Sequence, residues 1–255
     1  MNLTGKHIVV TGAGAGIGLG IARQCRAAGA DVTGIDVNAV GEAKLLGMGA
    51  RFTQADVSDL DAFEAAILDA HEHFGQLDGL VNNAGVTIKV PFLEMTRKQM
   101  ETLWNVNQRS VLFGSQVAGR IMAEAGSGVI VNIASNHASA TNPGHEGYAG
   151  TKGAIVSMTR AMAWSLAPYG IRVNSLSPGM TQTEVVIEAM KDPANAANFR
   201  SWAADNEVST VEEIGDAAVF LLSAASSAMN GADLVADRAM SNLLGVNDTR
   251  RKQNG

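Results

Sequence analysis

Tyr148 and Lys152 are the residues of this chain whose types and spacing most clearly allow chemistry. They lie four positions apart, which on a helix places a phenol and an ammonium on the same face. A nearby cation lowers the pKa of tyrosine from its usual value of about 10, whereas burial acts in the opposite direction. The pair therefore predicts a general base or acid near neutral pH, although the same spacing also occurs by chance.

A glycine-rich turn near the N-terminus predicts a nucleotide site. Thr11-Gly12-Ala13-Gly14-Ala15-Gly16-Ile17-Gly18 follows a short apolar run and opens a helical pattern. Glycines let such a turn bring backbone N–H groups close to a pyrophosphate at the helix N-terminus. A purely structural turn is the alternative, but the position in the first strand-turn-helix unit favours the nucleotide.

Asp36 ends the second predicted strand and bears on the choice of coenzyme. A carboxylate at this place accepts hydrogen bonds from ribose hydroxyls and repels a 2′-phosphate. Neither the glycine-rich turn nor the residues directly after Asp36 include an Arg or Lys that would offset the charge. The sequence therefore favours NAD over NADP, and the alternative is that Asp36 only caps a turn or the next helix.

Seven short β-rich runs alternate with longer segments of helical periodicity, which predicts one α/β domain over residues 1–255 with a Rossmann-like, doubly wound parallel sheet flanked by helices. The predicted strands are His7 to Val10, Asp31 to Ile35, Arg51 to Ala55, Gly79 to Val81, Val129 to Ile133, Arg172 to Ser175 and Asp233 to Ala236. The predicted helices include Ile17 to Ala28, Asp61 to Phe74, Val106 to Ala125, Ala149 to Ala167 and Val211 to Leu222.

Two segments lie outside this alternation. Thr181 to Val208 is polar and rich in Ala, Asn and Met, with Pro193 interrupting it, and we interpret residues 181–208 as a substrate flap. Residues 241–255 form a C-terminal tail whose last part carries Arg250, Arg251 and Lys252. An interaction arm is one interpretation of this tail, and a frayed terminus is the simpler one.

Composition narrows the classes of function. The net charge is −6 and the charged residues are dispersed, which disfavours nucleic acid or an anionic membrane as partner and favours a small molecule. We expect a cytoplasmic protein, because the N-terminus lacks signal-peptide features and no apolar run approaches a transmembrane length. The single cysteine, Cys25, excludes an internal disulfide and a multi-cysteine metal site, and its apolar neighbours indicate core packing.

From about Gly5 to Asp237 the chain resembles the short-chain dehydrogenase/reductase family. The motifs that carry the resemblance occur in the family's order and spacing, namely Thr-Gly-x-x-x-Gly-x-Gly at Thr11, Gly12, Gly16 and Gly18, Asn-Asn-Ala-Gly at Asn82, Asn83, Ala84 and Gly85, the active-site asparagine at Asn107, Ser135 ahead of Tyr148, and Pro178-Gly179 with Thr183.

The resemblance implies a catalytic site of Asn107, Ser135, Tyr148 and Lys152. Tyr148 would take the proton of a substrate hydroxyl while hydride leaves the same carbon for the nicotinamide. Lys152 would lower the pKa of the phenol and hold the ribose, and Ser135 would stabilise charge on the reacting oxygen. Asn107 would help hold a water beside the lysine. Taken singly, Ser135 is also explained as a turn cap and Asn107 as the start of a helix.

The resemblance also implies the coenzyme contacts and the assembly. The expected NAD contacts are Gly12, Ala15, Gly16, Ile17, Gly18, Asp36, Asp56, Val57, Asn83, Gly85, Tyr148, Lys152, Pro178, Gly179, Thr181 and Thr183. Several of these residues are also ordinary turn formers. Family members are commonly tetramers that pair the helices predicted at Val106 to Ala125 and Ala149 to Ala167, so a homotetramer is expected.

The segment from Asn136 to Gly147 offers many hydrogen-bonding groups and little bulky apolar surface. We therefore expect a polyol, sugar or hydroxy-acid substrate, with a secondary alcohol and a ketone, or a lactol and a lactone, interconverted. His137, His145 and Trp202 are candidate substrate contacts, although lone histidines are often structural and the tryptophan also suits packing. No third ligand at a convincing spacing supports a metal site.

Two other functions remain open. A 3-oxoacyl-carrier-protein-type reductase would share the fold and the four catalytic residues, but such enzymes usually prefer NADPH, which Asp36 and Ala15 disfavour. A non-catalytic NAD-binding regulatory protein is the second, and such relatives tend to lose the tyrosine or the lysine. The chain also departs from the family at Asp237-Arg238-Ala239, where Asp-Gly-Gly is usual, so we expect a turn that avoids glycine-like backbone conformations.

Overall fold

The seven predicted strands form one parallel sheet, which confirms the predicted fold class. The computed structural model describes residues 1–242, and its sheet has the order β3-β2-β1-β4-β5-β6-β7 with every neighbouring pair parallel. The strands are β1 His7–Thr11, β2 Asp31–Asp36, β3 Arg51–Gln54, β4 Gly79–Asn82, β5 Gly128–Ile133, β6 Ile171–Pro178 and β7 Asp233–Ala236. Only β6 extends more than one residue beyond its predicted end, to Pro178.

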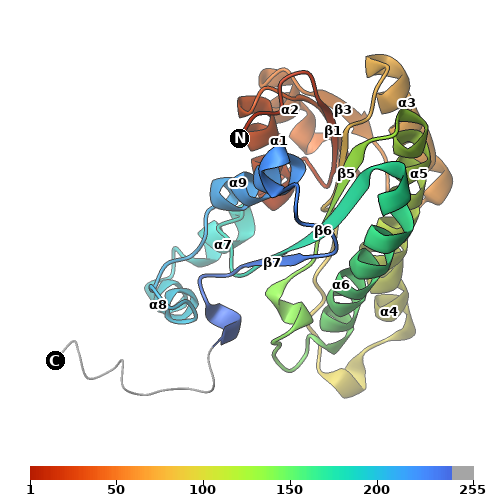
Figure 1. Ribbon diagram of the computed structural model, residues 1–255. Helices are drawn as coiled ribbons and strands as arrows, with labels where there is room; N and C mark the ends of the chain where they lie inside the picture. Colours follow the sequence, from red (N-terminus) through yellow and green to blue (C-terminus); the bar gives the residue numbers. More distant parts are fainter. Residues whose placement is uncertain (243–255) are drawn as a thin grey trace.

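Helices cover both faces of the sheet (Figure 1). The helices are α1 Gly16–Ala27, α2 Glu42–Gly47, α3 Leu60–Phe74, α4 Arg97–Leu103, α5 Ser110–Ala125, α6 Glu146–Leu166, α7 Glu184–Ala189, α8 Pro193–Ser201 and α9 Val211–Leu222. Apolar side chains of α1, α2 and α9 form the core on one face, and those of α3, α5 and α6 form the core on the other. The two layers leave the central strands buried on both sides, as a parallel sheet requires.

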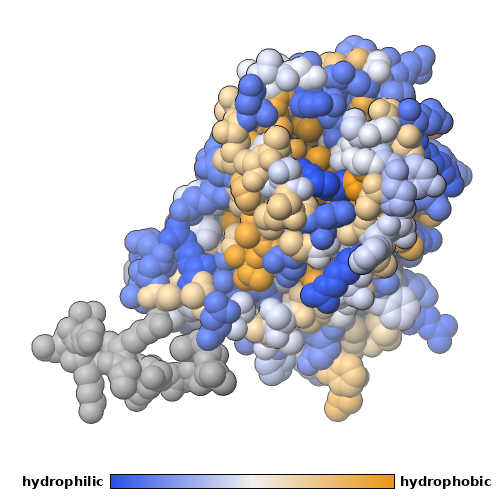
Figure 2. All heavy atoms as spheres, in the orientation of Figure 1, coloured by the Kyte–Doolittle hydropathy of each residue, from blue (hydrophilic) through white to orange (hydrophobic). Residues whose placement is uncertain are grey.

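The outer face of this arrangement is mostly polar. Figure 2 shows hydrophilic residues over much of the face seen in Figure 1, with hydrophobic residues gathered near its centre. Among residues 1–242 no helix is long and apolar enough to cross a membrane.

Buried polar groups as well as apolar contacts hold the central strands to the helices. The Asn82 side-chain amide in β4 donates to Asn132 Oδ1 in β5 at 2.9 Å and to Ser115 Oγ in α5 at 3.0 Å. Asn132 in turn donates to Thr159 Oγ1 in α6 at 2.9 Å. These groups are at most 3% exposed, and a buried polar group without a partner costs about 1–3 kcal/mol. The chain of bonds therefore fixes how α5 and α6 sit on the sheet.

The strand order reverses between β1 and β4. From β1 the chain moves outward to β2 and β3, then returns to β4 on the other side of β1 and continues to β7. The connections that follow β1 and β4 therefore run in opposite directions and leave a crevice between the carboxyl ends of these strands. Open parallel sheets bind ligands in such a crevice. The glycine-rich turn follows β1, so the fold brings it to this crevice.

The predicted flap contains α7 and α8, and its two ends meet at the sheet. Thr181 forms an isolated parallel bridge with Ser209, and the Gln182 N–H donates to the Ser209 carbonyl oxygen at 2.8 Å. The segment consequently leaves and returns at one place. The basic end of the predicted tail lies outside the described residues.

The turn after β7 contradicts the sequence prediction. Arg238 and Ala239 have φ angles of 52° and 62°, so both adopt the left-handed conformation that we expected this turn to avoid. For a residue with a Cβ this conformation costs roughly 1–2 kcal/mol. The prediction failed because it considered the local backbone preference alone, whereas contacts made by Arg238 hold the turn in place.

Candidate active site

A cleft of about 590 Å³ opens at the carboxyl ends of the strands, beside the point where the strand order reverses. Its walls come from the glycine-rich turn, the ends of β2, β4, β5 and β6, the first turns of α6, and the start of the flap. All of the predicted coenzyme contacts except Thr181 line it. Thr181 lies beneath the surface, where its hydroxyl donates to the Gly179 carbonyl oxygen at 3.0 Å.

The glycine-rich turn fits a coenzyme pyrophosphate. Gly12 has a φ of 63°, and a Cβ on it would lie 2.9 Å from Ala84 Cα. A Cβ on Gly18 would lie 2.0 Å from the Gly12 carbonyl oxygen. The N-cap residue of α1, Ala15, has no side-chain group that caps the helix. The Gly16 N–H in the first turn of α1 is held by Glu184 Oε2, and the other N–H groups of this turn and the positive end of the helix dipole suit an anionic ligand.

Asn83 braces this turn from β4. Its side-chain amide donates to the carbonyl oxygens of Thr11 at 2.9 Å and Gly12 at 3.2 Å. In return, Thr11 Oγ1 accepts the N–H groups of Asn83 and Ala84, both at 3.0 Å. These four bonds join the ends of β1 and β4, so the second asparagine of the Asn-Asn-Ala-Gly motif both lines the cleft and fixes the turn.

Asp36 places a carboxylate in the cleft wall beside the glycine-rich turn. Its carboxylate accepts the Gly14 N–H at 2.8 Å and the Asn38 N–H at 2.9 Å. The next cation along the chain, Lys44, is paired with Glu184 at 3.4 Å. The sequence left capping of a turn and contact with the coenzyme as alternatives for Asp36. In the structure Asp36 both caps a turn and lines the cleft.

Glu184 is a cleft residue that the sequence did not single out. Its Oε2 accepts the Gly16 N–H at 3.0 Å, at the N-terminus of α1. Burial raises the pKa of Glu184, but hydrogen bonds from its own backbone N–H, from Gly16 and from Lys44 outweigh this effect, and the net pKa lies below the usual value. A second carboxylate thus borders the coenzyme cleft, and its place directly after the motif residue Thr183 is the signal that could have indicated it.

Tyr148, Lys152 and Ser135 come together at the inner end of the cleft. Tyr148 and Lys152 lie one turn apart on α6, and Lys152 Nζ is 5.7 Å from the centre of the phenol ring. Nζ donates to the Ile133 carbonyl oxygen at the end of β5, at 2.8 Å. Ser135 follows the same strand, and its hydroxyl hydrogen-bonds the phenol. The hydroxyl also accepts the His137 N–H at 3.1 Å, so Ser135 caps a turn as well.

The pKa of Tyr148 moves in the direction opposite to the sequence prediction. Burial has the largest effect and raises the pKa of Tyr148, while hydrogen bonds from Ser135 and Thr87 lower it by less. Burial also lowers the pKa of Lys152, to about 8, because the ammonium is only 4% exposed. The prediction underestimated desolvation, which disfavours the charged form of both groups. Thr87 was not among the residues that the sequence singled out.

Asn107 lies in the middle of a continuous helix, which corrects the interpretation that it begins one. Residues Trp104–Arg109 form a π-helical segment between α4 and α5. Asn107 is fully buried; its amide donates to the carbonyl oxygen of Val86 at 2.9 Å and to Thr151 Oγ1 at 3.2 Å, and its Oδ1 accepts the Val86 N–H at 2.8 Å. It does not line the cleft itself, and π-turns of this kind often occur at functional sites.

Gly85 explains how Asn107 and Lys152 approach each other. A Cβ on Gly85 would lie 3.3 Å from Asn107 Oδ1 and 3.6 Å from Lys152 Nζ. Any larger side chain would enter the space between the two groups. At the glycine of the Asn-Asn-Ala-Gly motif even a Cβ would therefore make a tight contact with Asn107 Oδ1, whatever the contact of this residue with a coenzyme.

Two of the three predicted substrate contacts lie beside the phenol. The ring of His137 is 5.5 Å from that of Tyr148, and the ring of His145 is 6.5 Å from it. His145 Nδ1 is buried without a hydrogen-bond partner among the described residues. Trp202 instead packs against Phe199 in the flap, with ring centres 5.3 Å apart, and does not line the cleft. Within residues 1–242 no group of three His, Cys, Asp or Glu side chains could hold a metal ion.

Comparison with known proteins decides the family. The family model described as Enoyl-(Acyl carrier protein) reductase matches residues 12–241. The chain belongs to the short-chain dehydrogenase/reductase family. Members of this family are oxidoreductases that bind a nicotinamide coenzyme, and a nicotinamide coenzyme is the type of ligand expected at the glycine-rich turn and in the cleft.

Two curated relatives and one solved structure show how similar this short-chain dehydrogenase/reductase is to others. It is 35% identical to D-threitol dehydrogenase from Mycolicibacterium smegmatis over 241 residues, which are 92% of each chain. It is 34% identical to gluconate 5-dehydrogenase from Gluconobacter oxydans over 246 residues, 92% of this chain and 94% of the relative. The structure of gluconate 5-dehydrogenase from Burkholderia cenocepacia in complex with NADP and tartrate matches with a TM-score of 0.88 and 33% identity, over 95% of this chain and 98% of that one.

The low pKa of Lys152 predicts a specific pH dependence of stability. The unfolded chain holds this proton up to about pH 10.4, whereas the folded protein releases it near pH 8. Between these values the unfolded state binds more protons, so the Lys152 contribution to the free energy of unfolding rises with pH, by about 2 kcal/mol from pH 8 to pH 10.

Urea unfolding of the parent and of Lys152→Met at both pH values measures this contribution. The buried thiol of Cys25, whose pKa burial raises to about 12, acts with the opposite sign in both proteins and cancels in their difference. We expect the parent to gain stability relative to the variant as pH rises. Equal changes in the two proteins would show that the folded ammonium titrates normally.

Proposed function

We propose that this oxidoreductase uses NAD to interconvert a secondary alcohol and a ketone, or a lactol and a lactone, on a polyol, sugar or hydroxy acid. The observation that carries the proposal is the position of Tyr148. Hydrogen bonds from the hydroxyls of Ser135 and Thr87 lower the pKa of its phenol, and Lys152 lies on the same face of α6. The phenol borders the same cleft as the glycine-rich turn. These groups together suit proton transfer at a substrate oxygen beside a bound coenzyme.

The residues of the chain have distinct parts in the proposed reaction. When bound, NAD supplies the acceptor for the hydride. Tyr148 takes the proton of the substrate hydroxyl, and in the reverse direction it returns a proton to the carbonyl oxygen. Ser135 donates to the same oxygen and stabilises the charge that develops there. Lys152 stabilises the phenolate as an ammonium and binds the nicotinamide ribose.

Asn107 acts through its neighbours. It is fully buried, and its amide and carbonyl groups bond Val86 and Thr151. Thr151 precedes Lys152 on α6, and Val86 follows Gly85 in the cleft wall. We therefore assign Asn107 to fixing the wall beside Lys152, with the water-holding role carried over from the family resemblance.

The preference for NAD rests on charge. The Asp36 carboxylate borders the cleft and is fixed by two backbone N–H groups, and Glu184 adds a second acidic group. A 2′-phosphate beside Asp36 would meet like charge, and Lys44 is already paired with Glu184. The gluconate 5-dehydrogenase structure contains NADP, so the preference for NAD is proposed from the acidic groups of this chain alone.

The substrate class is supported by the groups around the phenol and by the relatives. Ser135, Thr87, His137 and His145 offer hydrogen-bonding groups within the same region as Tyr148. D-threitol dehydrogenase and gluconate 5-dehydrogenase are named for a polyol and a sugar acid, and one similar structure holds tartrate, a hydroxy acid. A hydroxyl-rich substrate is therefore favoured over an acyl chain.

The 3-oxoacyl-carrier-protein-type reductase remains the second candidate, because the matching family model is described by an enzyme that also acts on acyl-carrier-protein thioesters, although on a carbon–carbon double bond. The intact Tyr148 and Lys152 disfavour the third, a protein that binds NAD without catalysis. An assay with NADPH and a 3-oxoacyl thioester separates the first two, since the fixed acidic groups disfavour NADPH.

Removal of the phenol hydroxyl tests the proposed mechanism. In a screen of polyols, aldoses and hydroxy acids with NAD, followed by NADH absorbance, we expect Tyr148→Phe to lower kcat by a factor of about 10² to 10⁴. Binding of NADH, measured by its fluorescence, should stay within a few fold of the parent, which serves as the control for an intact cleft. Turnover of the same substrate at the parental rate would refute the role of Tyr148.

Replacement of the cleft carboxylate tests the coenzyme preference. We expect Asp36→Ala to lower the ratio of kcat/KM for NAD to that for NADP by about ten-fold, equivalent to roughly 1.4 kcal/mol of lost repulsion and ribose binding. Asp31→Ala is the matched control, because Asp31 lies in the same strand at its other end and is exposed. If both variants keep the parental ratio, Asp36 does not select the coenzyme.

The homotetramer is proposed from the resemblance and from exposed apolar groups. Trp164 on α6 is 86% exposed, Trp104 in the π-helical segment is 56% exposed, and Leu112 on α5 is 51% exposed. Large apolar side chains on neighbouring helices are typical of interfaces. Light scattering of the purified protein should give the mass of four chains, and Trp164→Glu should give smaller species, whereas Leu46→Glu on α2 should not. A monomeric parent would contradict this assembly.

A further inference from the structure

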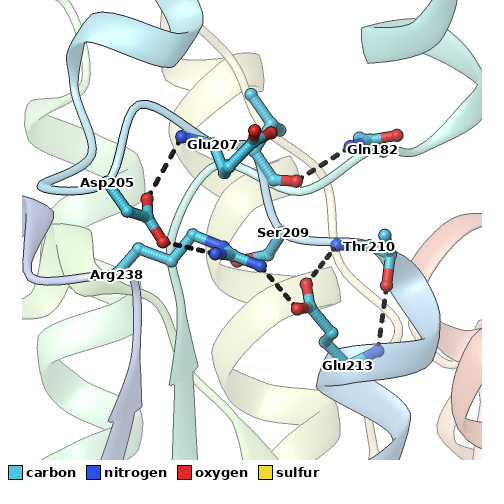
Figure 3. A network of polar contacts seen from close by, with 8 residues as sticks. Gln182, Asp205, Glu207, Ser209, Thr210, Glu213 and Arg238 are labelled. Atoms are coloured by element: carbon cyan, nitrogen blue, oxygen red, sulfur yellow. Dashed lines mark hydrogen bonds and ion pairs between the residues drawn. The ribbon is translucent and has the colours of Figure 1, made fainter.

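Arg238 is the centre of a polar network that joins the flap to β7 and α9 (Figure 3). Its guanidinium pairs with Asp205 at 2.5 Å and with Glu213 at 2.5 Å, and its Nε donates to Ser209 Oγ at 3.2 Å. Asp205 and Ser209 belong to the segment that leads from α8 to α9, which we call the return arm, residues 203–209. The Arg238 side chain thus contacts three residues, two in the return arm and one in α9.

The backbone adds to the same connection. The Ala204 N–H donates to the Arg238 carbonyl oxygen at 2.9 Å. At the base of the flap, the Ser209 N–H donates to the Met180 carbonyl oxygen at 3.3 Å, and the Gln182 side chain donates to the Val208 carbonyl oxygen at 2.8 Å. The return arm is therefore held on one side by the outgoing strand of the flap and on the other by Arg238.

Glu213 gives Arg238 a rigid support. The Glu213 carboxylate accepts the Thr210 N–H at 2.8 Å, and Thr210 Oγ1 accepts the Glu213 N–H at 3.1 Å, which makes a capping box at the start of α9. The helix thus fixes one partner of the guanidinium, and the other partner is Asp205 on the return arm.

The unusual backbone at this turn serves a second contact. With Arg238 and Ala239 in the left-handed conformation, the chain continues to Met240, whose Sδ accepts the Asn136 side-chain N–H at 3.0 Å. Asn136 directly follows Ser135. The same turn consequently touches the flap on one side and the segment that carries the serine on the other. Backbone strain in residues other than glycine persists only where the surroundings hold it, and it is common at functional sites.

The location of the ion pairs suggests a local effect. The side chains of Arg238, Asp205 and Glu213 are 25%, 48% and 49% exposed, and such pairs contribute little to global stability. The hydrogen bond from Arg238 lowers the pKa of Asp205, and the Thr210 backbone followed by Arg238 lowers that of Glu213. Both carboxylates are therefore ionised at neutral pH, and the guanidinium is needed between them.

We propose that Arg238 is a positioning residue that holds the return arm, and with it the 181–208 flap, in the orientation that completes the substrate wall. The inference rests on the proposed function and on the interpretation of residues 181–208 as a substrate flap, whose first residues Thr183 to Val185 line the cleft. Arg238 touches neither Tyr148 nor the glycine-rich turn, so it affects the fit of the substrate rather than the proton transfer or the coenzyme.

Four variants of the full chain separate this role from others. Arg238→Ala removes both ion pairs, and Arg238→Lys keeps the charge but cannot reach Asp205, Glu213 and Ser209 together. Ala239→Gly gives the turn the flexibility of glycine while it leaves the guanidinium in place. Arg23→Ala is the control, because Arg23 pairs with Glu212 on α9 at 3.3 Å and lies outside the flap, with a side chain that is 47% exposed against 25% for Arg238.

Limited digestion with trypsin reports on the flap without any substrate. Lys191 and Arg200 are exposed cleavage sites within the flap. We expect Arg238→Ala to be cut there about five-fold to ten-fold faster than the parent, a change that matches the loss of two surface ion pairs in a locally opening segment. Arg238→Lys should fall between the two, and Ala239→Gly and Arg23→Ala should resemble the parent.

Kinetics with the substrate found in the screen give the second measurement. For Arg238→Ala we expect KM to rise about five-fold or more, with kcat within about three-fold and NADH binding unchanged. Unchanged flap cleavage and unchanged KM would overturn the proposal. A higher KM together with equally large losses of kcat and coenzyme affinity would also overturn it, because such a result indicates general unfolding. Asp205→Asn repeats the test from the other partner if Arg238→Ala does not fold.

These outcomes are distinct from failure of the proposed function. If Tyr148→Phe keeps full activity, the mechanism is wrong, yet trypsin still reports whether Arg238 holds the flap. If Tyr148→Phe is inactive and Arg238→Ala has the parental KM and cleavage rate, only the positioning role is wrong.

Discussion

Burial of the Lys152 ammonium is the constraint on which the rest of the site depends. The group is 4% exposed and donates to the Ile133 carbonyl oxygen at the end of β5, so it has lost most of its hydration and its pKa falls to about 8. Its surroundings must therefore be small or polar. Gly85 leaves the space beside Nζ, and Asn107 lines that space from the π-helical segment. The motif glycine and the buried asparagine thus both lie close to the buried cation.

Burial also affects the protonation of Tyr148. Desolvation favours the neutral forms of Tyr148 and Lys152, which is opposite to the ion pair that a base at neutral pH requires. Ser135 and Thr87 act against this by donating to the phenol oxygen. The basicity of the site thus comes from several elements: α6 supplies the phenol and the cation, while β5 and the segment after β4 supply the hydroxyls.

The sequence predicted the parts of the molecule that local pattern determines. Alternating strands and helices gave the doubly wound sheet, and motif spacing indicated the residues that meet at the cleft. It did not predict the π-helical segment at Asn107, which arises because the side chain bonds Val86 and Thr151 from other elements. It was wrong about the turn at Arg238, because the contacts that accompany the left-handed conformation, including ion pairs to residues 25 and 33 positions away, are distant in sequence. Contacts distant in sequence have no periodicity from which they could be read.

Different interactions hold the wall of the cleft around Tyr148 and the wall formed by the flap, so substitutions in the two walls have different effects. The chemical wall stands on buried hydrogen bonds such as those from Asn82 to Asn132 and on to Thr159, which open only when the sheet and helices separate. The flap wall is fastened by exposed ion pairs around Arg238, whose loss opens one segment without disturbing the sheet. A substitution in the flap or at its fastening can therefore alter which substrate fits, while the proton transfer at Tyr148 keeps its own support.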